Sequence, residues 1–225
     1  MENENIITMD GPAGSGKSTL ARNLAQAVGW SCLDTGAIYR AVALVASERG
    51  VGLDRPQEAG ELAAGLDVRL YAENGVTLTV VGDRDVTGLL RTPEISALTS
   101  KYSAIPEVRA ALMGLQRRLG AGGRVVAEGR DMGTVVFPLA PLKFFLTASP
   151  EARARRRYLQ LAREGVLVDQ EEILEGILAR DHNDSSRETA RLEPALDAYI
   201  IDSTNLSAFE VETIMIGEAK RVFGI

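Results

Sequence analysis

The octet at residues 11–18 reads Gly11-Pro12-Ala13-Gly14-Ser15-Gly16-Lys17-Ser18, and Thr19 follows it. It matches the phosphate-loop pattern G-x-x-x-x-G-K-[ST] at every fixed position. The apolar run Ile6–Asp10 just before it indicates a buried strand, and Lys17–Val28 indicates a helix that stops at Gly29. Strand, glycine-rich loop and helix follow one another in the order that the motif requires, so these residues predict a nucleoside triphosphate site.

The residue types of this octet suit a bound phosphate. Glycines at positions 11, 14 and 16 permit backbone conformations that a Cβ would block, so successive N–H groups can face phosphate oxygens. Lys17 supplies a charge for the β- and γ-phosphates, and the Ser18 hydroxyl is placed to hold Mg²⁺. A glycine-rich turn without a ligand is the alternative interpretation, and the flanking strand and helix disfavour it.

The composition of this chain of 225 residues suits one α/β domain over residues 1–225, with room for a small insertion. Its net charge of −6 argues against a nucleic-acid duplex or an anionic membrane as the main partner. No apolar run reaches the roughly 18 residues of a membrane span, and residues 1–5 do not resemble a signal peptide. The single cysteine, Cys32, cannot form an internal disulfide. We therefore expect a cytoplasmic protein.

Further short apolar runs predict the other strands of the sheet, at residues 31–34, 124–128, 142–146 and 198–201. Helical patterns separate these strands, at residues 35–50, 92–119 with a break near Pro106, 150–166, 169–181 and 207–223. Strands that alternate with helices imply a parallel sheet with right-handed crossovers. The predicted fold class is therefore α/β, a phosphate-loop NTPase fold whose five-stranded parallel sheet is flanked by helices.

Between residues 63 and 91 the pattern changes from helical to alternating. Apolar and polar residues alternate from Val68 to Val80 on both sides of Asn74-Gly75, which is a hairpin turn dipeptide. Gly82-Asp83 offers a further turn. We expect a small antiparallel β insertion in this part of the chain.

Charged residues stand where the predicted strands end. Glu128 closes one strand, which makes it a candidate for the outer shell of a bound Mg²⁺. Arg40 lies one turn into the helix that follows Asp34, so it suits an anion at the carboxyl edge of the sheet, the alternative being a solvated helix residue. The helix that begins near residue 150 is either a solvated basic face or an anion-binding one, and it carries Arg153, Arg155, Arg156, Arg157 and Arg163.

The reaction has to be argued separately from nucleotide binding. The Asn-Lys-x-Asp box of GTPases is absent from the sequence, and a motor or nucleic-acid ATPase would be larger and more basic. Arginines stand instead at separated points, namely Arg40, Arg130, Arg187 and the cluster at 153–157. Phosphoryl transfer requires charge around both ends of the moving group, so this distribution favours a kinase with a phosphorylated acceptor. His182, the only histidine, is expected to be a surface residue without a role.

Several stretches resemble bacterial cytidylate kinases, and the resemblance covers nearly the whole chain. They are Ile7-Thr8-Met9-Asp10-Gly11-Pro12-Ala13-Gly14-Ser15-Gly16-Lys17, Leu33-Asp34-Thr35-Gly36-Ala37-Ile38-Tyr39-Arg40, Gly129-Arg130-Asp131-Met132-Gly133-Thr134-Val135-Val136-Phe137-Pro138, and Arg180-Asp181 followed by Asp184-Ser185. The third stretch is specific to this family among phosphate-loop kinases. The resemblance implies Mg²⁺-dependent transfer of the γ-phosphoryl group of ATP to CMP or dCMP by a monomer.

The resemblance also implies roles for individual residues. ATP would contact the octet, Thr19, Arg156 and Arg157, and the metal would be held by Ser18 and, through water, by Glu128. CMP would contact Thr35, Tyr39, Arg40, Ser100, Arg109, Arg130, Asp131, Arg180, Asp184 and Arg187. The catalytic residues would be Lys17, Arg130, Asp131 and Arg187. The helix at 150–166 would form a lid, and the insertion at 63–91 would flank the monophosphate site.

The chemistry of cytosine agrees with this assignment. A carboxylate such as that of Asp131 accepts a hydrogen bond from the exocyclic N4 amino group of cytosine, whereas uracil presents a carbonyl oxygen there. Arg109 can donate to the ring and orient Asp131. Asp131 is therefore expected to set base specificity, although a combined catalytic role stays open. Two alternatives also stay open, a phosphate-loop kinase acting on UMP or a non-nucleotide acceptor, and a regulator that binds ATP without turnover.

Overall fold

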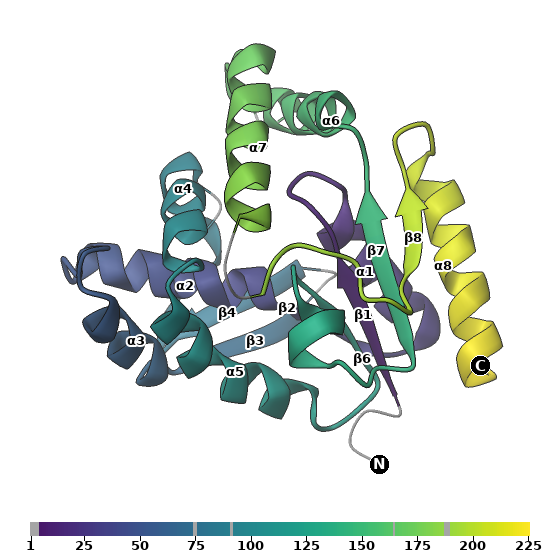
Figure 1. Cartoon of the computed structure of the whole chain (residues 1–225), viewed down its shortest axis with the longest axis horizontal. Helices are drawn as coiled ribbons and strands as arrows, with labels where there is room; N and C mark the ends of the chain where they lie inside the picture. Colours follow the sequence, from purple (N-terminus) through teal and green to yellow (C-terminus); the bar gives the residue numbers. More distant parts are fainter. Residues whose placement is uncertain (1–4, 74–75, 91, 164, 187–189) are drawn as a thin grey trace.

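The computed structural model describes residues 5–73, 76–90, 92–163, 165–186 and 190–225 (Figure 1). Within these ranges, five parallel strands form the main sheet in the order β2-β6-β1-β7-β8. Their bounds are β1 Ile6–Asp10, β2 Ser31–Asp34, β6 Val125–Glu128, β7 Leu142–Thr147 and β8 Tyr199–Asp202. The prediction of an α/β fold around a five-stranded parallel sheet is confirmed.

Strands β1 and β6 lie inside this sheet, and every residue of both is buried. Apolar runs favour such strands, because helices cover both faces of a parallel sheet. The register places Glu128, the last residue of β6, opposite Met9 of β1 and opposite Asp34 of β2. The acidic ends of neighbouring strands are therefore brought together at the carboxyl edge of the sheet.

Helices pack on both faces of the main sheet. On one face, α1 (Lys17–Val28) and α8 (Ala208–Phe223) cover an apolar core that includes Phe144 of β7. On the other face, α2 (Thr35–Glu48) and α5 (Pro106–Gly120) cover a second core. None of the helices in the described ranges combines the length with the apolar character that crossing a membrane requires.

The remaining helices surround these layers. Helix α3 (Pro56–Ala64) packs on α5, and α4 (Pro93–Tyr102) packs on α2. Helices α6 (Pro150–Arg163) and α7 (Gln170–Ser185) pack on each other. Figure 1 shows this pair beyond the tip of β7, on the side of the sheet where the parallel strands end.

The predicted insertion is a small antiparallel sheet in the order β3-β4-β5. Its strands are β3 Val68–Glu73, β4 Val76–Val81 and β5 Arg84–Asp85, while the predicted turn Asn74-Gly75 lies outside the described residues. Val68 and Val86 are buried in the same apolar core as Ile38 of α2. The insertion therefore shares its packing with the main domain.

Local features differ from the sequence-based expectations. No pattern predicts α3, and none predicts the short π-helical turn Met132–Val136. The helix expected at 169–181 continues to Ser185, so it also carries Asp184. The strand expected from residue 124 begins at Val125, because Arg124 has a φ of 53° and cannot continue an extended strand.

Candidate active site

The phosphate loop, residues 11–18, connects β1 to α1 at the carboxyl edge of the sheet. Gly11, Gly14 and Gly16 have φ angles of 145°, 76° and 98°, in the region that favours glycine. A Cβ on Gly11 would also overlap the backbone carbonyl of Leu146 in β7. The glycines that the motif requires are therefore fixed both by backbone conformation and by a close approach to the next strand.

Lys17 is folded back onto its own loop and is only 5% exposed. Its Nζ donates to the carbonyl oxygen of Pro12 at 2.7 Å and to Ser15 Oγ at 3.3 Å. Burial lowers the pKa of Lys17 well below its usual value, and the Arg130 charge lowers it further, while Glu128 opposes the shift. The loop therefore holds the lysine, and any anion that binds Nζ would have to replace these two acceptors.

Glu128 is a buried carboxyl group at the end of β6. Burial and the nearby Asp34 raise the pKa of Glu128 to about 7, while Lys17 and a hydrogen bond from the Ser18 side chain lower it. Its Oε1 has no hydrogen-bond partner within the part of the chain that the structure describes. An oxygen without a partner, next to the Ser18 hydroxyl, fits the oxygen ligands and water shell of Mg²⁺.

Two arginines at this edge are held by carboxylates through ion pairs. Arg40 Nη2 lies 3.3 Å and 3.2 Å from the two oxygens of Asp34, which also caps α2 by accepting from the Ala37 N–H. Arg130 Nε lies 2.9 Å from Oδ2 of Asp184, a buried residue of α7. Each pair leaves further N–H groups of the guanidinium for another anion.

Arg109 of α5 and Asp131 form a buried ion pair just after the end of β6. Arg109 Nη1 also donates to the Ser103 carbonyl oxygen at 3.2 Å, and its guanidinium lies 5.7 Å from the ring centroid of Tyr39. These contacts fix the arginine on three sides. Ser100 is buried in α4, and its Oγ has no hydrogen-bond partner among the described residues.

The structure brings most of the predicted site residues to one edge of the sheet. Thr35 begins α2 and donates from Oγ1 to the Glu128 carbonyl oxygen at 2.7 Å. Arg180 of α7 is half-buried, and its charge acts on Lys17. Arg187, predicted to bind the acceptor phosphate, lies outside the described residues.

One arginine of α6, Arg153, makes contacts within the protein that neither sequence-based interpretation names. Arg153 is only 2% exposed, and its guanidinium lies 3.0 Å and 2.5 Å from the two oxygens of Asp181. It also donates to the Ala13 carbonyl oxygen at 3.0 Å. An ion pair therefore joins the helix to α7, and a hydrogen bond joins it to the phosphate loop. The alternative of a solvated face is wrong for Arg153, while anion binding by this helix stays a prediction.

The two arginines predicted to contact ATP have different partners. Arg156 donates to the Ser15 carbonyl oxygen at 3.3 Å and to the Ser203 Oγ at 3.0 Å, so it lies against the phosphate loop. Arg157 donates to Gln160 of its own helix at 2.9 Å. Arg156 therefore contacts the phosphate loop, and a contact of either arginine with ATP stays a prediction.

Some residues of this edge were not selected from the sequence. Asp10 and Asp34 also end apolar strands, so the signal that selected Glu128 applies to both. No local signal indicates the pairing of Arg153 with Asp181, because it depends on how α6 packs on α7. The pair could not be found without the fold.

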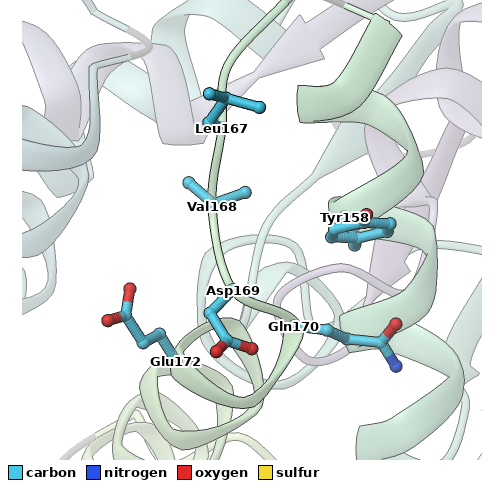
Figure 2. Close-up of a pocket in the computed structure, with 6 residues that line it drawn as sticks. All are labelled: Tyr158, Leu167, Val168, Asp169, Gln170 and Glu172. Carbon is cyan, nitrogen blue, oxygen red and sulfur yellow. The ribbon is translucent and has the colours of Figure 1, made fainter.

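Figure 2 shows a hollow on the surface, where the connection from α6 enters α7. It is lined by Tyr158, Leu167, Val168, Asp169, Gln170 and Glu172. The described phosphate-loop residues and the ion pairs above contribute nothing to its lining. The hollow therefore shares no lining residue with the phosphate loop or with these ion pairs.

The comparisons with known proteins point to one family. The family model described as cytidylate kinase matches residues 7–221. The chain belongs to the cytidylate kinase family. A cytidylate kinase from Saccharophagus degradans is 47% identical over 216 residues, covering 96% of each chain. One from Pseudomonas aeruginosa is 46% identical over 218 residues, covering 96% of this chain and 95% of the relative.

Membership of the cytidylate kinase family confirms the resemblance found in the sequence. Cytidylate kinases are phosphotransferases that act on nucleoside monophosphates. A phosphate loop beside several arginines suits such a reaction, since both substrates carry phosphate groups.

The ion pair between buried Arg153 and partly exposed Asp181 should contribute to stability. Replacing Arg153 by Ala removes the partner of Asp181 and leaves polar groups of the loop and α7 unsatisfied, so the free energy of unfolding should fall by about 1–3 kcal/mol. Arg155→Ala is the matched control, because Arg155 is exposed on the same helix and its removal should change stability by about 0.5 kcal/mol or less. Urea denaturation measures both, and equal losses would contradict a specific role for Arg153.

The raised pKa of Glu128 should make stability depend on pH. Between its ordinary pKa of 4.5 and the folded-state pKa of about 7, the folded protein retains a proton that the unfolded chain has lost. The free energy of unfolding should therefore contain a contribution that falls as pH rises through this range. Glu128→Gln lacks this contribution. Its free energy of unfolding should therefore rise relative to that of the wild type by up to about 1.4 kcal/mol per pH unit.

The measurement is urea denaturation of ligand-free protein without Mg²⁺, at several pH values across that range. A constant difference between variant and wild type at every pH would show that Glu128 titrates normally, against the assigned burial effect.

Proposed function

We propose that this protein transfers the γ-phosphoryl group of ATP to CMP or dCMP, with Mg²⁺, and releases ADP with CDP or dCDP. The observation that carries the proposal is the buried Arg109–Asp131 pair next to a phosphate loop. The pair offers a fixed carboxylate for a base, and the loop offers N–H groups for a triphosphate.

The acceptor base is selected by the buried pair in this proposal. Arg109 donates to Oδ2 of Asp131 and so orients the carboxylate. The carboxylate then accepts a hydrogen bond from the cytosine N4 amino group. The Ser100 hydroxyl, which has no hydrogen-bond partner among the described residues, and the Tyr39 ring would lie beside the base. Uracil would place a carbonyl oxygen against the carboxylate, which loses a hydrogen bond and adds repulsion.

The acceptor phosphate would meet Arg40 and Arg130. Both guanidiniums are held at one side by carboxylates, Asp34 and Asp184, which orients them before the substrate arrives. Arg40 Nε is buried and has no hydrogen-bond partner among the described residues, so it is a donor ready for an anion. Arg187 would join them, as the sequence predicts. Such charge-assisted contacts fix the phosphate for attack.

The donor phosphates would lie in the phosphate loop, with Lys17 released from Pro12 and Ser15. Ser18 and Glu128 would hold Mg²⁺, directly and through water, and the ion would neutralise charge on the β- and γ-phosphates. Arg156 lies against Ser15 of the loop and would contact the same phosphates. The moving group requires little covalent help, so the positive groups around it supply most of the rate.

Release of ADP, coupled to a spectroscopic reporter, tests this proposal with CMP, dCMP, UMP, AMP, GMP and no acceptor. CMP and dCMP should give the fastest turnover, because Asp131 pairs only with cytosine among the pyrimidines. Preference for UMP would move the protein to another branch of phosphate-loop kinases. Binding of ATP without turnover on any acceptor would instead make it a regulator.

Asp131→Asn tests the specificity group itself. The change keeps the shape but places a donor against the cytosine amino group, so kcat/KM for CMP should fall and the CMP preference over UMP should narrow by about tenfold or more. Asp83→Asn at an exposed turn is the control and should change neither value. An unchanged preference in Asp131→Asn would assign the carboxylate to catalysis or structure.

A further inference from the structure

Asp10 is the last residue of β1 and directly precedes Gly11 of the phosphate loop. Its side chain is buried, and it points to a segment more than a hundred residues further along the chain. Oδ1 accepts from the Met132 N–H at 2.9 Å, and Oδ2 accepts from the Gly133 N–H at 2.8 Å. The two oxygens of one carboxylate therefore accept hydrogen bonds from two consecutive backbone N–H groups.

These amides open the turn Met132–Val136, whose first N–H groups have no acceptor within the turn. Later N–H groups are satisfied, since those of Val135 and Val136 donate to the Asp131 carbonyl oxygen at 2.9 Å and 3.1 Å. Asp10 supplies the acceptors that the start of the turn lacks. Arg130 and Asp131 stand immediately before this start, so the same contact sets their place relative to the phosphate loop.

The turn also packs tightly on β1. A Cβ on Gly133 would lie 2.9 Å from Thr8 Oγ1 and 3.4 Å from Asp10 Oδ2, so no larger residue fits without movement. Upstream, the Gly129 N–H donates to the Met9 carbonyl oxygen at 3.0 Å. Residues 129–133 are therefore attached to β1 at both ends, and Asp10 provides the charged attachment.

Burial raises the pKa of Asp10 to about 6, and the two backbone hydrogen bonds oppose the shift. The charges that act on it are those of Asp131, which raises the pKa, and Lys17, which lowers it. A carboxyl group with a pKa of about 6 is mostly ionised at neutral pH. An ionised acceptor makes stronger hydrogen bonds to the turn.

We propose that Asp10 is a positioning residue for phosphoryl transfer: it holds the turn Met132–Val136 on β1, and so keeps Arg130 and Asp131 at a fixed distance from the phosphate loop. The inference rests on the proposed transfer to CMP or dCMP and deepens it, since Asp10 acts through other residues. Asp10 joins the loop that holds the donor to the segment that holds the acceptor. Displacing the turn by a fraction of an ångström would misalign the two phosphates.

Asp10→Asn keeps the size of the side chain but turns an NH₂ group toward one backbone N–H. The turn then loses a hydrogen bond and gains a contact between two donors. We expect kcat with CMP to fall by about a hundredfold, as misplacement of reacting groups does. The CMP preference over UMP should narrow as well, whereas the KM for ATP should stay within about twofold, because Gly11 and the loop backbone are unchanged.

Thr8→Val is the matched control. Thr8 lies two residues earlier on the same side of β1, is fully buried and lies close to Gly133, yet its Oγ1 has no hydrogen-bond partner among the described residues. The change preserves the shape of the side chain, so turnover and base preference should match the wild type. Equal losses of turnover and base preference in both variants would show that Asp10 acts only through packing, which would overturn the inference.

Steady-state kinetics with CMP, UMP and ATP on wild type and both variants decide the matter. Unchanged kcat and base preference in Asp10→Asn, or a loss confined to the KM for ATP, would overturn the inference. If Asp10→Asn does not fold, Asp10→Glu carries the test: it keeps the charge but moves the carboxylate by one methylene, and normal kinetics would again overturn the inference. If the wild type prefers another monophosphate, the proposed function fails, and the same comparison with that acceptor still decides the role of Asp10.

Discussion

The pairing of buried charges at the carboxyl edge of the sheet is the constraint on which this site depends. Strand register sets Glu128 beside Asp34, and Asp10 ends the adjoining strand. Buried carboxylates are costly unless hydrogen bonds or cations compensate them. The fold supplies Arg40 to Asp34 and two backbone amides to Asp10. Glu128 is compensated only in part, and the pKa of this residue therefore rises to about 7.

Two ion pairs of α7 connect the donor side of the proposed site with its acceptor side. Helix α7 holds Arg153 of α6 through Asp181 and Arg130 through Asp184, three residues further along the same helix. Arg153 in turn contacts the phosphate loop. A movement of α6 on nucleotide binding would therefore reach the arginine that is proposed to hold the acceptor phosphate. If α6 is the lid that the family resemblance implies, its closure would exclude water from the transferred group.

Local sequence signals predicted much of this fold, but few of the ion pairs that connect its segments. The phosphate loop, its strand and its helix follow from glycine spacing and apolar periodicity, and α1 has the predicted bounds Lys17–Val28. Helix α3 was missed because its residues, which include Gly60, have only a weak helical pattern. Packing on α5 stabilises the helix in spite of it. The roles of individual residues came from the phosphate-loop motif, from charges at strand ends and from the family resemblance. They stay predictions, as do the monomeric state and the cytoplasmic location. The pairs Arg130–Asp184 and Arg153–Asp181 join residues 54 and 28 positions apart, so no spacing in the sequence indicates them.

The most direct test is a crystal structure with CMP, Mg²⁺ and a non-hydrolysable ATP analogue bound together. The Asp131 carboxylate should lie on the N4 amino group of cytosine, and Arg40 and Arg130 should lie on the CMP phosphate. Lys17 should have left the Pro12 carbonyl oxygen for the β- and γ-phosphates. A cytosine ring bound away from the Arg109–Asp131 pair, or a Lys17 still bound to Pro12, would contradict the account.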